Sequence, residues 1–288
     1  MHEVKTLGVL GCGLMGSGIA QVAAQAGYRT IVLEVDQALL DDGLGRIEQF
    51  LSKGVARGKV TEDAKAATIA NITGTTRYED LKACDLVVEA IVENLDAKKD
   101  AYRHVEAVVR ADAILASNTS SLCITELAAS TTRPDRFAGL HFFNPVPLMK
   151  LVEVIRALTT SDETHRRLMA FAQALGKDPI VAPDRPGFIV NRLLVPYLLD
   201  AVRAYEHGLG SLEDIDKGMK LGCGHPMGPF TLLDFVGIDT TYYIANIMHD
   251  EFREPAYAPP PLLKRMLLAG RVGRKKGRGF YDYEGVKG

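Results

Sequence analysis

The sequence predicts an α/β domain built on a mostly parallel sheet, followed by an all-helical domain. In residues 1–183, short runs rich in β-branched residues alternate with longer helical patterns, which is typical of βαβ units. Beyond a Pro- and Gly-rich segment at 183–187, only helical patterns occur. We therefore expect one domain over residues 1–183 and a second over residues 184–288.

Composition and charge argue against several classes of function. The 288 residues suggest about two domains, and 47% apolar with 24% charged residues is typical of a soluble globular protein. A net charge of −2 gives no strong field for nucleic acid or an anionic membrane. The four cysteines are scattered without a Cys-x-x-Cys pair, which argues against a disulfide framework or a metal site. We also expect a location in the cytoplasm, or in an organelle matrix after removal of a leader, since the chain enters a strand without a signal peptide and has no run of about 18 apolar residues.

The first strand, expected at 6–10, ends in Gly-x-Gly-x-x-Gly and runs into a helical pattern. Gly11 allows a sharp turn, Gly13 allows a pyrophosphate to approach the backbone, and Gly16 allows the helix to pack on the strand. The N–H groups at the helix start, at Leu14 and Met15, then face the phosphates. This pattern predicts a Rossmann-like, dinucleotide-binding sheet.

Glu34 indicates which dinucleotide binds. It follows the next apolar run, 30–33, and lies 18 residues after Gly16, near the usual position of an acid that accepts hydrogen bonds from ribose hydroxyls. Its negative charge would repel a 2′-phosphate. The sequence therefore predicts NAD rather than NADP as the cofactor.

The remaining elements follow from the same patterns. Further strands are expected at 72–75, 86–89, 114–117, 137–140 and 151–155, with 180–181 as another candidate; helices of the second domain are expected at 188–207, 212–221, 230–251 and 261–269. The helix at 188–207 is apolar on nearly all sides, so we expect it to be buried between domains or against a second subunit.

An insertion at 37–70 reads as two helices around Gly58. Its exposed side carries Lys53, Arg57 and Lys59. One interpretation is a solvated basic face. The other is a docking surface for a phosphate-bearing handle of the substrate.

His141 and Glu153 are the candidate chemical pair. His141 falls at the carboxyl end of a predicted strand, where open α/β sheets bind ligands. Glu153 lies inside an apolar strand and needs a partner, because buried carboxylates rarely stay unpaired. A bond from Glu153 to one ring nitrogen would fix the tautomer of a general base. The alternatives are a hydrogen-bonded core histidine and an ion pair of Glu153 with Lys150 or Arg156, although both neighbours face the other side of the strand.

Three polar residues have more than one interpretation each. Ser120 and Ser121 follow the strand at 114–117 and could bind a ligand or cap a helix that begins near residue 122. Asn191 lies in an apolar helix, where an amide without partners is costly. It therefore indicates a polar ligand, an interdomain bond or a bond across a dimer interface.

Several motifs together resemble the short-chain L-3-hydroxyacyl-CoA dehydrogenases, and most of all the bacterial 3-hydroxybutyryl-CoA dehydrogenases. The resemblance covers essentially the whole chain. Besides the glycine loop, it includes Glu-Ala-Ile-Val-Glu-Asn at 89–94, Ser-Asn-Thr-Ser-Ser at 117–121, His-Phe-Phe-Asn-Pro at 141–145, Pro-Gly-Phe-Ile-Val-Asn-Arg at 186–192, Pro-Met-Gly-Pro at 226–229 and the tail at 273–281.

The resemblance implies roles for individual residues. His141 matches the family's catalytic base and Glu153 the carboxylate that orients it, while Ser120 and Asn191 match the groups that hold the substrate's oxygen. The residues that match positions near the nicotinamide are Glu93, Lys98, Ser120, Asn144 and Lys275. Glu34 stands where the family more often has aspartate.

The resemblance also implies an activity, namely hydride transfer between NAD and an (S)-3-hydroxyacyl-CoA, and a homodimer formed through the helical domain. Lys53 and Arg57 lie on the insertion that receives the CoA nucleotide, but Phe50 replaces a polar residue of the family. The alternatives are an NAD-dependent dehydrogenase of a free hydroxy acid such as L-gulonate, and a non-catalytic NAD sensor. No metal is expected.

Overall fold

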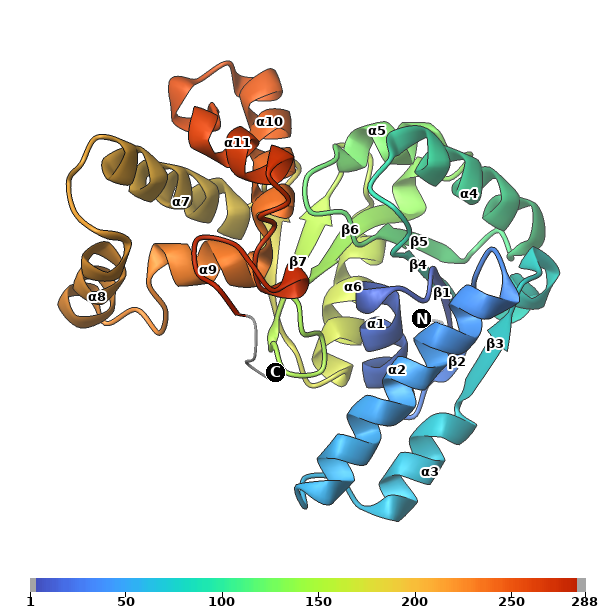
Figure 1. Cartoon of the computed structure of the whole chain (residues 1–288). Coiled ribbons are helices and arrows are strands. Elements are labelled where there is room, and N and C mark those ends of the chain that lie inside the picture. Colours follow the sequence, from blue (N-terminus) through green and yellow to red (C-terminus); the bar gives the residue numbers. More distant parts are fainter. Residues whose placement is uncertain (1–3, 284–288) are drawn as a thin grey trace. The chain divides into compact units, whose positions relative to one another are not determined.

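The computed structural model describes residues 4–283 and separates the chain into two compact units, Met1–Asp184 and Arg185–Gly288 (Figure 1). The first unit contains every strand of the sheet, and the second, as far as residue 283, contains helices, short turns of 3-10 helix and two isolated β-bridges near its end. The predicted fold class, a mostly parallel sheet domain followed by a helical region, is confirmed.

The first unit is built on an eight-stranded sheet in the order β3-β2-β1-β4-β5-β6-β7-β8. The strands are β1 (Thr6–Leu10), β2 (Arg29–Leu33), β3 (Ile72–Thr75), β4 (Leu86–Glu89), β5 (Ile114–Ser117), β6 (Phe137–Phe142), β7 (Leu151–Arg156) and β8 (Asp178–Pro183). All neighbours are parallel except β6 and β7, which are antiparallel. The strand order reverses direction at β1 and β4, which is where such sheets bind dinucleotides.

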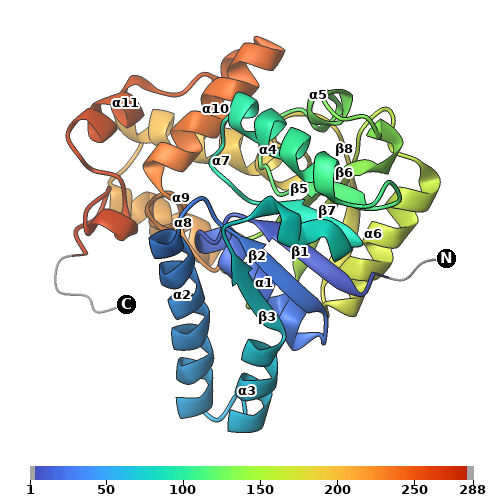
Figure 2. The same ribbon diagram turned by 90° about the vertical axis from the view of Figure 1, so that its right-hand side faces the viewer.

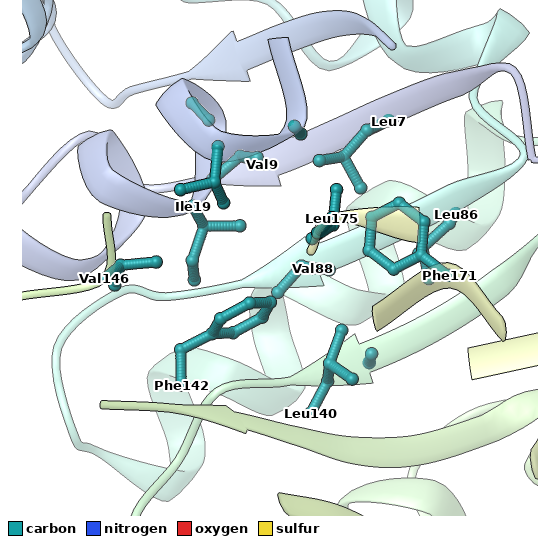
Figure 3. Packing of buried hydrophobic residues seen from close by; sticks show 14 of the residues in the cluster. Leu7, Val9, Ile19, Leu86, Val88, Leu140, Phe142, Val146, Phe171 and Leu175 are labelled. Carbon is teal, nitrogen blue, oxygen red and sulfur yellow. The ribbon is translucent and has the colours of Figure 1, made fainter. Parts of the chain in front are cut away.

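Helices cover both faces of this sheet. On one face, α1 (Leu14–Gln25) and α6 (Asp162–Ala174) bury their apolar sides against alternate residues of the strands. Figure 3 shows Ile19 of α1 and Phe171 of α6 in the same core cluster as Val9, Val88 and Leu140 of the strands. The other face carries α4 (Leu95–Val108) and α5 (Ile124–Ala129), with the 3-10 turn η1 at Tyr78–Ala83. The edge-to-face contact of Tyr102 with Phe137, at 4.9 Å between ring centroids, belongs to this second face.

The insertion forms two helices, α2 (Gln37–Ala56) and α3 (Glu62–Ala70), that extend beyond the sheet (Figure 2). Asp36 and Thr61 cap them by accepting hydrogen bonds from the N–H groups of Leu39 and Ala64. Gly58 has φ +67, a left-handed conformation that favours glycine, and it reverses the chain between the two helices.

The second unit contains α7 (Val190–Glu206), α8 (Leu212–Cys223), α9 (Pro229–Val236), α10 (Ile238–Phe252) and α11 (Pro261–Leu268), with the 3-10 turns η3 (Pro255–Tyr257) and η4 (Arg274–Lys276). The expected single helix at 230–251 is wrong. Gly237 has φ +103 and interrupts the helical pattern, so α9 ends and α10 begins there. Apolar periodicity continues across this break, which is why the sequence alone suggests one helix.

Two buried aspartates hold the second unit's tail and helices together. Asp216 of α8 accepts hydrogen bonds from the N–H groups of Phe230 and Thr231 at the start of α9. Asp234 of α9 accepts from the N–H groups of Phe280 and Tyr281. Each carboxylate therefore satisfies backbone donors that would otherwise be buried without partners.

Among residues 4–283, no helix is both long enough and apolar enough to cross a membrane. The same part of the chain contains no group of three or more His, Cys, Asp or Glu side chains arranged to hold a metal ion.

Candidate active site at the carboxyl edge of the sheet

The glycine loop between β1 and α1 is shaped to receive a ligand. Gly11 has φ +89, and a Cβ there would lie 2.8 Å from the carbonyl oxygen of Ala90, while a Cβ on Gly16 would lie 1.9 Å from the carbonyl oxygen of Gly11. At Gly13, by contrast, a Cβ would meet nothing within 4 Å. The loop is therefore packed tightly on its inner side and open on its outer side.

The start of α1 supplies donors beside that open side. Gly13 is the N-cap and no side chain caps the helix, so the N–H groups of Leu14, Met15 and Gly16 have no intrahelical acceptor. The first N–H that bonds within the helix is that of Ser17, to the carbonyl of Gly13 at 2.9 Å. Unpaired N–H groups and the positive end of the helix dipole suit a pyrophosphate, so this loop fits a dinucleotide.

Two side chains fix the peptide of Cys12 within this loop. Glu34 accepts a hydrogen bond from the N–H of Cys12 at 2.6 Å, and Arg46 of α2 donates to its carbonyl oxygen at 2.8 Å. Burial, reinforced by Glu34, raises the pKa of the Cys12 thiol to about 11, so the side chain stays a neutral thiol. The sequence does not predict this contact of Arg46, because Arg46 and Cys12 lie 34 positions apart in the chain.

His141 and Glu153 face each other across the antiparallel pair β6–β7. They are direct register partners, and Nδ1 of His141 lies 2.7 Å from Oε2 of Glu153. The exposed fraction is 4% for His141 and 0% for Glu153. Arg156, one alternative partner for Glu153, instead forms an ion pair with Asp162 at 2.6 Å. A proton held on Nδ1 by the carboxylate makes Nε2 the basic nitrogen of the ring.

Asn118 secures the strand end that carries His141. Its Oδ1 accepts a hydrogen bond from the N–H of Phe142 at 2.9 Å. The ring of Phe143 packs against the imidazole at 4.6 Å between centroids. These contacts link the segment after β5 to the end of β6.

Glu93, in the loop before α4, gathers the segment that follows β5. It accepts hydrogen bonds from the hydroxyl of Thr119, the N–H of Ser120 at 3.2 Å and the hydroxyl of Ser121 at 3.2 Å. Burial alone would raise the pKa of Glu93, but Lys98 and these donors outweigh it and hold the pKa below its ordinary value. Glu93 therefore carries a negative charge at neutral pH.

The helix-capping interpretation of the serines is not what the structure shows. Helix α5 begins at Ile124, and Asp184 accepts from the N–H groups of Ile124 at 2.8 Å and Thr125 at 2.6 Å. Ser121 bonds to Glu93 instead, and Ser120 is half-buried beside it. Because Asp184 lies about 60 residues away in the chain, sequence spacing gives no sign of this cap.

Lys98 lies inside the first unit rather than on its surface. Its ammonium contacts Glu89 at 2.6 Å and Glu93 at 3.1 Å, and the side chain is 1% exposed. Glu89 also accepts from the N–H of Ile91 at 2.8 Å and the hydroxyl of Ser117 at 2.7 Å. Sequence reasoning missed Glu89, although an acid that ends an apolar strand is the same signal that identifies Glu34.

The remaining residues predicted for the site lie after β6, near the end of α2 and in the second unit. Asn144 is exposed after β6 and precedes a cis peptide bond to Pro145. Lys53 and Arg57 are exposed on the last turns of α2, and Phe50 is 36% exposed one turn earlier. In the second unit, Asn191 is half-buried in the first turn of α7, and Lys275 forms an ion pair with Asp239 at 2.8 Å. The structure thus groups Glu93, Lys98, Ser120, His141 and Glu153 at one edge of the sheet.

Comparison with known proteins agrees with this geometry. Residues 6–185 match the family described as 3-hydroxyacyl-CoA dehydrogenase, NAD binding domain, and residues 187–283 match the C-terminal domain of the same family. The chain is 48% identical over 282 residues to 3-hydroxybutyryl-CoA dehydrogenase of Mycobacterium tuberculosis, covering 97% of this chain and 99% of that protein. It is 49% identical over 289 residues to human mitochondrial hydroxyacyl-coenzyme A dehydrogenase, covering 98% and 92% of the two chains.

A solved structure gives the same result. The crystal structure of (S)-3-hydroxybutyryl-CoA dehydrogenase from Ralstonia eutropha superposes with a TM-score of 0.93 at 46% identity, covering 98% of this chain and 99% of that chain. The predicted cofactor NAD and the predicted oxidoreductase class are confirmed by the family match. Both domains and nearly the full length agree, and the chain belongs to the 3-hydroxyacyl-CoA dehydrogenase family.

Proposed function

We propose that this protein interconverts (S)-3-hydroxyacyl-CoA and 3-oxoacyl-CoA with NAD, and that 3-hydroxybutyryl-CoA is a substrate. The hydrogen bond between His141 and Glu153, at the edge of the sheet that carries the glycine loop, is the observation that supports this most. A buried imidazole with one nitrogen held by a carboxylate is suited to act as a general base or acid. The names of the similar proteins supply the substrate class.

In the proposed mechanism, His141 removes the proton of the substrate hydroxyl through Nε2. Glu153 holds the ring in one tautomer and stabilises the imidazolium that results. Ser120 and Asn191 donate to the substrate oxygen as it becomes a carbonyl. NAD, when bound, supplies the hydride acceptor, and the protein contributes orientation and electrostatics. In the reverse direction His141 returns the proton.

We assign coenzyme binding to residues of the first unit and to one of the second. The loop from Gly11 to Gly16, with Leu14 and Met15, would hold the pyrophosphate, and Glu34 the adenosine ribose. Glu93, Lys98, Ser120, Asn144 and Lys275 would surround the nicotinamide end. Lys98 would act there through its two carboxylate partners, since its ammonium is buried between them.

The α2–α3 hairpin is our candidate for the CoA nucleotide. Lys53 and Arg57 lie on successive turns of α2 and are exposed, so they can contact phosphates. Phe50, one turn earlier, offers an exposed aromatic edge in place of a polar group. Affinity on this surface would come from charge and from stacking.

We further propose that the helical unit, residues 184–288, forms a homodimer and that the enzyme works in the cytoplasm. Large apolar side chains are exposed on this unit, namely Leu193, Leu209, Leu221, Phe235, Tyr243 and Leu268. Exposed apolar surface of this kind is typical of subunit contacts. The four cysteines are unpaired thiols, which suits a reducing compartment.

The substrate class can be tested by following NADH consumption with acetoacetyl-CoA and with free acetoacetate at equal concentrations. We expect oxidation of NADH with the CoA ester and little with the free acid, because only the ester carries the nucleotide handle. Comparable rates with both compounds, or a preference for L-gulonate in the oxidative direction, would instead favour a dehydrogenase of free hydroxy acids.

Replacing the base tests the mechanism. We expect His141→Gln to lower kcat by about 10²–10⁴-fold, the usual contribution of a general acid–base group, and to leave NADH affinity unchanged. Stopped-flow turnover and NADH fluorescence titration measure the two quantities. His104→Gln, on the exposed side of α4, is the control and should behave like the natural protein. Turnover within a few-fold of the natural rate would remove His141 from the mechanism.

The hairpin assignment predicts a difference between two substrates. We expect Lys53→Ala combined with Arg57→Ala to raise KM for acetoacetyl-CoA by roughly tenfold, since each phosphate contact contributes on the order of 1 kcal/mol. The reaction of acetoacetyl-pantetheine, which lacks the nucleotide, should be unaffected. Equal losses with both substrates would show that these cations do not bind the nucleotide.

The assembly proposal predicts a mass near twice the 31.3 kDa of one chain in light scattering coupled to gel filtration. Leu193→Asp, on α7, should shift the protein towards the single-chain mass because it places a charge in the interface. Leu158→Asp, at a 91% exposed position of the first unit, should not. A single-chain mass for the natural protein would disprove the homodimer.

A further inference from the structure

Three ionisable side chains form a compact group beside the candidate active site. Lys98 lies between Glu89 and Glu93, at 2.6 Å and 3.1 Å, and we call these three residues the buried charge cluster. Two carboxylates and one ammonium give it a formal net charge of −1. The mechanism proposed above makes no use of this net charge.

The cluster is rigidly held. Glu89 is fully buried and accepts from the N–H of Ile91, from the hydroxyl of Ser117 and from Lys98. Burial alone would lower the pKa of Lys98, but Glu89 and Glu93 outweigh it and raise the pKa above its ordinary value. Lys98 therefore stays cationic at neutral pH.

The cluster shares one face and one edge of the sheet with the catalytic pair. Glu89 is the register partner of Ser117, and Ser117 is the register partner of Gly139. Paired residues project to the same face, and His141, two residues after Gly139, projects to it as well. The segment from Asn118 to Ser121 bridges the two groups, through Phe142 on one side and Glu93 on the other.

The direction of the dinucleotide follows from the strand order. Glu34, which we assign to the adenosine ribose, directly follows β2, and the glycine loop, which we assign to the pyrophosphate, directly follows β1. A Cβ on Gly11 would touch Ala90, so this loop lies directly against the residue that follows Glu89. The other half of the coenzyme must extend over the ends of β4, β5 and β6, where the buried charge cluster lies.

We propose that the net negative charge of the buried charge cluster raises the affinity of the enzyme for oxidised NAD relative to its reduced form, with Glu89 as the residue that anchors this charge. The inference rests on the proposed function, because it takes the nicotinamide to lie over the cluster. The nicotinamide ring carries one positive charge when oxidised and none when reduced. A fixed negative charge in a site shielded from water stabilises only the charged form.

Glu89 is a positioning residue in this proposal. It is 0% exposed, so it acts on the coenzyme through its charge and through Lys98 rather than by touching it. Glu93 is 27% exposed and is the member that can face a ligand. A change at Glu89 therefore alters the field at the ring without removing a group that contacts it.

The test is the ratio of two dissociation constants, measured without substrate. Glu89→Gln keeps the shape and an acceptor oxygen but removes one negative charge. We expect the ratio of the Kd for NAD+ to the Kd for NADH to rise about ten- to thirtyfold, as for one unit charge roughly 8–12 Å from the ring at an effective dielectric constant of about 20. Calorimetry gives the first constant and NADH fluorescence titration gives the second.

Asp85→Asn is a matched control. Asp85 directly precedes β4, at its opposite end, and is also a buried acid that accepts from backbone N–H groups, those of Lys5 and Thr6. It also pairs with Arg110 at 2.9 Å. We expect this variant to lose thermal stability, as Glu89→Gln also should, but to keep the natural ratio of the two constants.

Each outcome bears on the proposal. An unchanged ratio in Glu89→Gln, or an equal change in Asp85→Asn, overturns it. If Glu89→Gln does not fold, Glu93→Gln removes the same charge at a partly exposed position, and an unchanged ratio there overturns it equally. Failure of the natural protein to bind either form of the coenzyme would instead count against the proposed function.

Discussion

The antiparallel pairing of β6 with β7 is the constraint on which the candidate active site depends. It makes His141 and Glu153 register partners, and so brings two residues 12 positions apart in the chain within hydrogen-bond distance. All other neighbours in the sheet are parallel, and parallel strands need a long crossover between them. A short turn after His141 is therefore enough to return an acid to its side. The chemistry follows from the single reversal of direction in the sheet.

Carboxylates within or directly after apolar strands hold neighbouring segments against the sheet. Glu34 after β2 holds the peptide of Cys12, Glu89 at the end of β4 holds Lys98 and Ser117, and Glu153 within β7 holds His141. A buried acid without partners would destabilise the fold, so each one selects a conformation in which donors from another segment surround it. The same buried carboxylates therefore both stabilise the fold and hold residues of the candidate active site in place.

Much of this arrangement could be predicted from the sequence, because it depends on local patterns. The glycine loop and Glu34 follow from spacing, and the pair of His141 with Glu153 follows from strand alternation, which excludes Lys150 and Arg156 as same-face partners. The missed features depend on contacts distant in the chain. Asp184 caps α5 from about 60 residues away, and Gly237 divides a helix whose apolar pattern continues through it. Glu89 ends an apolar strand as an acid, but its partners Lys98 and Ser117 lie on other segments, which spacing does not reveal.

Helix α2 packs directly on the glycine loop, and this packing constrains the residue at position 43. Gly43 lies so close to Cys12 that a Cβ on Gly43 would be 2.3 Å from the carbonyl oxygen of Cys12. Arg46, one turn later, donates a hydrogen bond to the same carbonyl oxygen. The α2–α3 hairpin and the glycine loop are therefore in direct contact at Cys12. Any residue larger than glycine at position 43 would push the hairpin away from this loop, so the position of the hairpin depends on the absence of a side chain there.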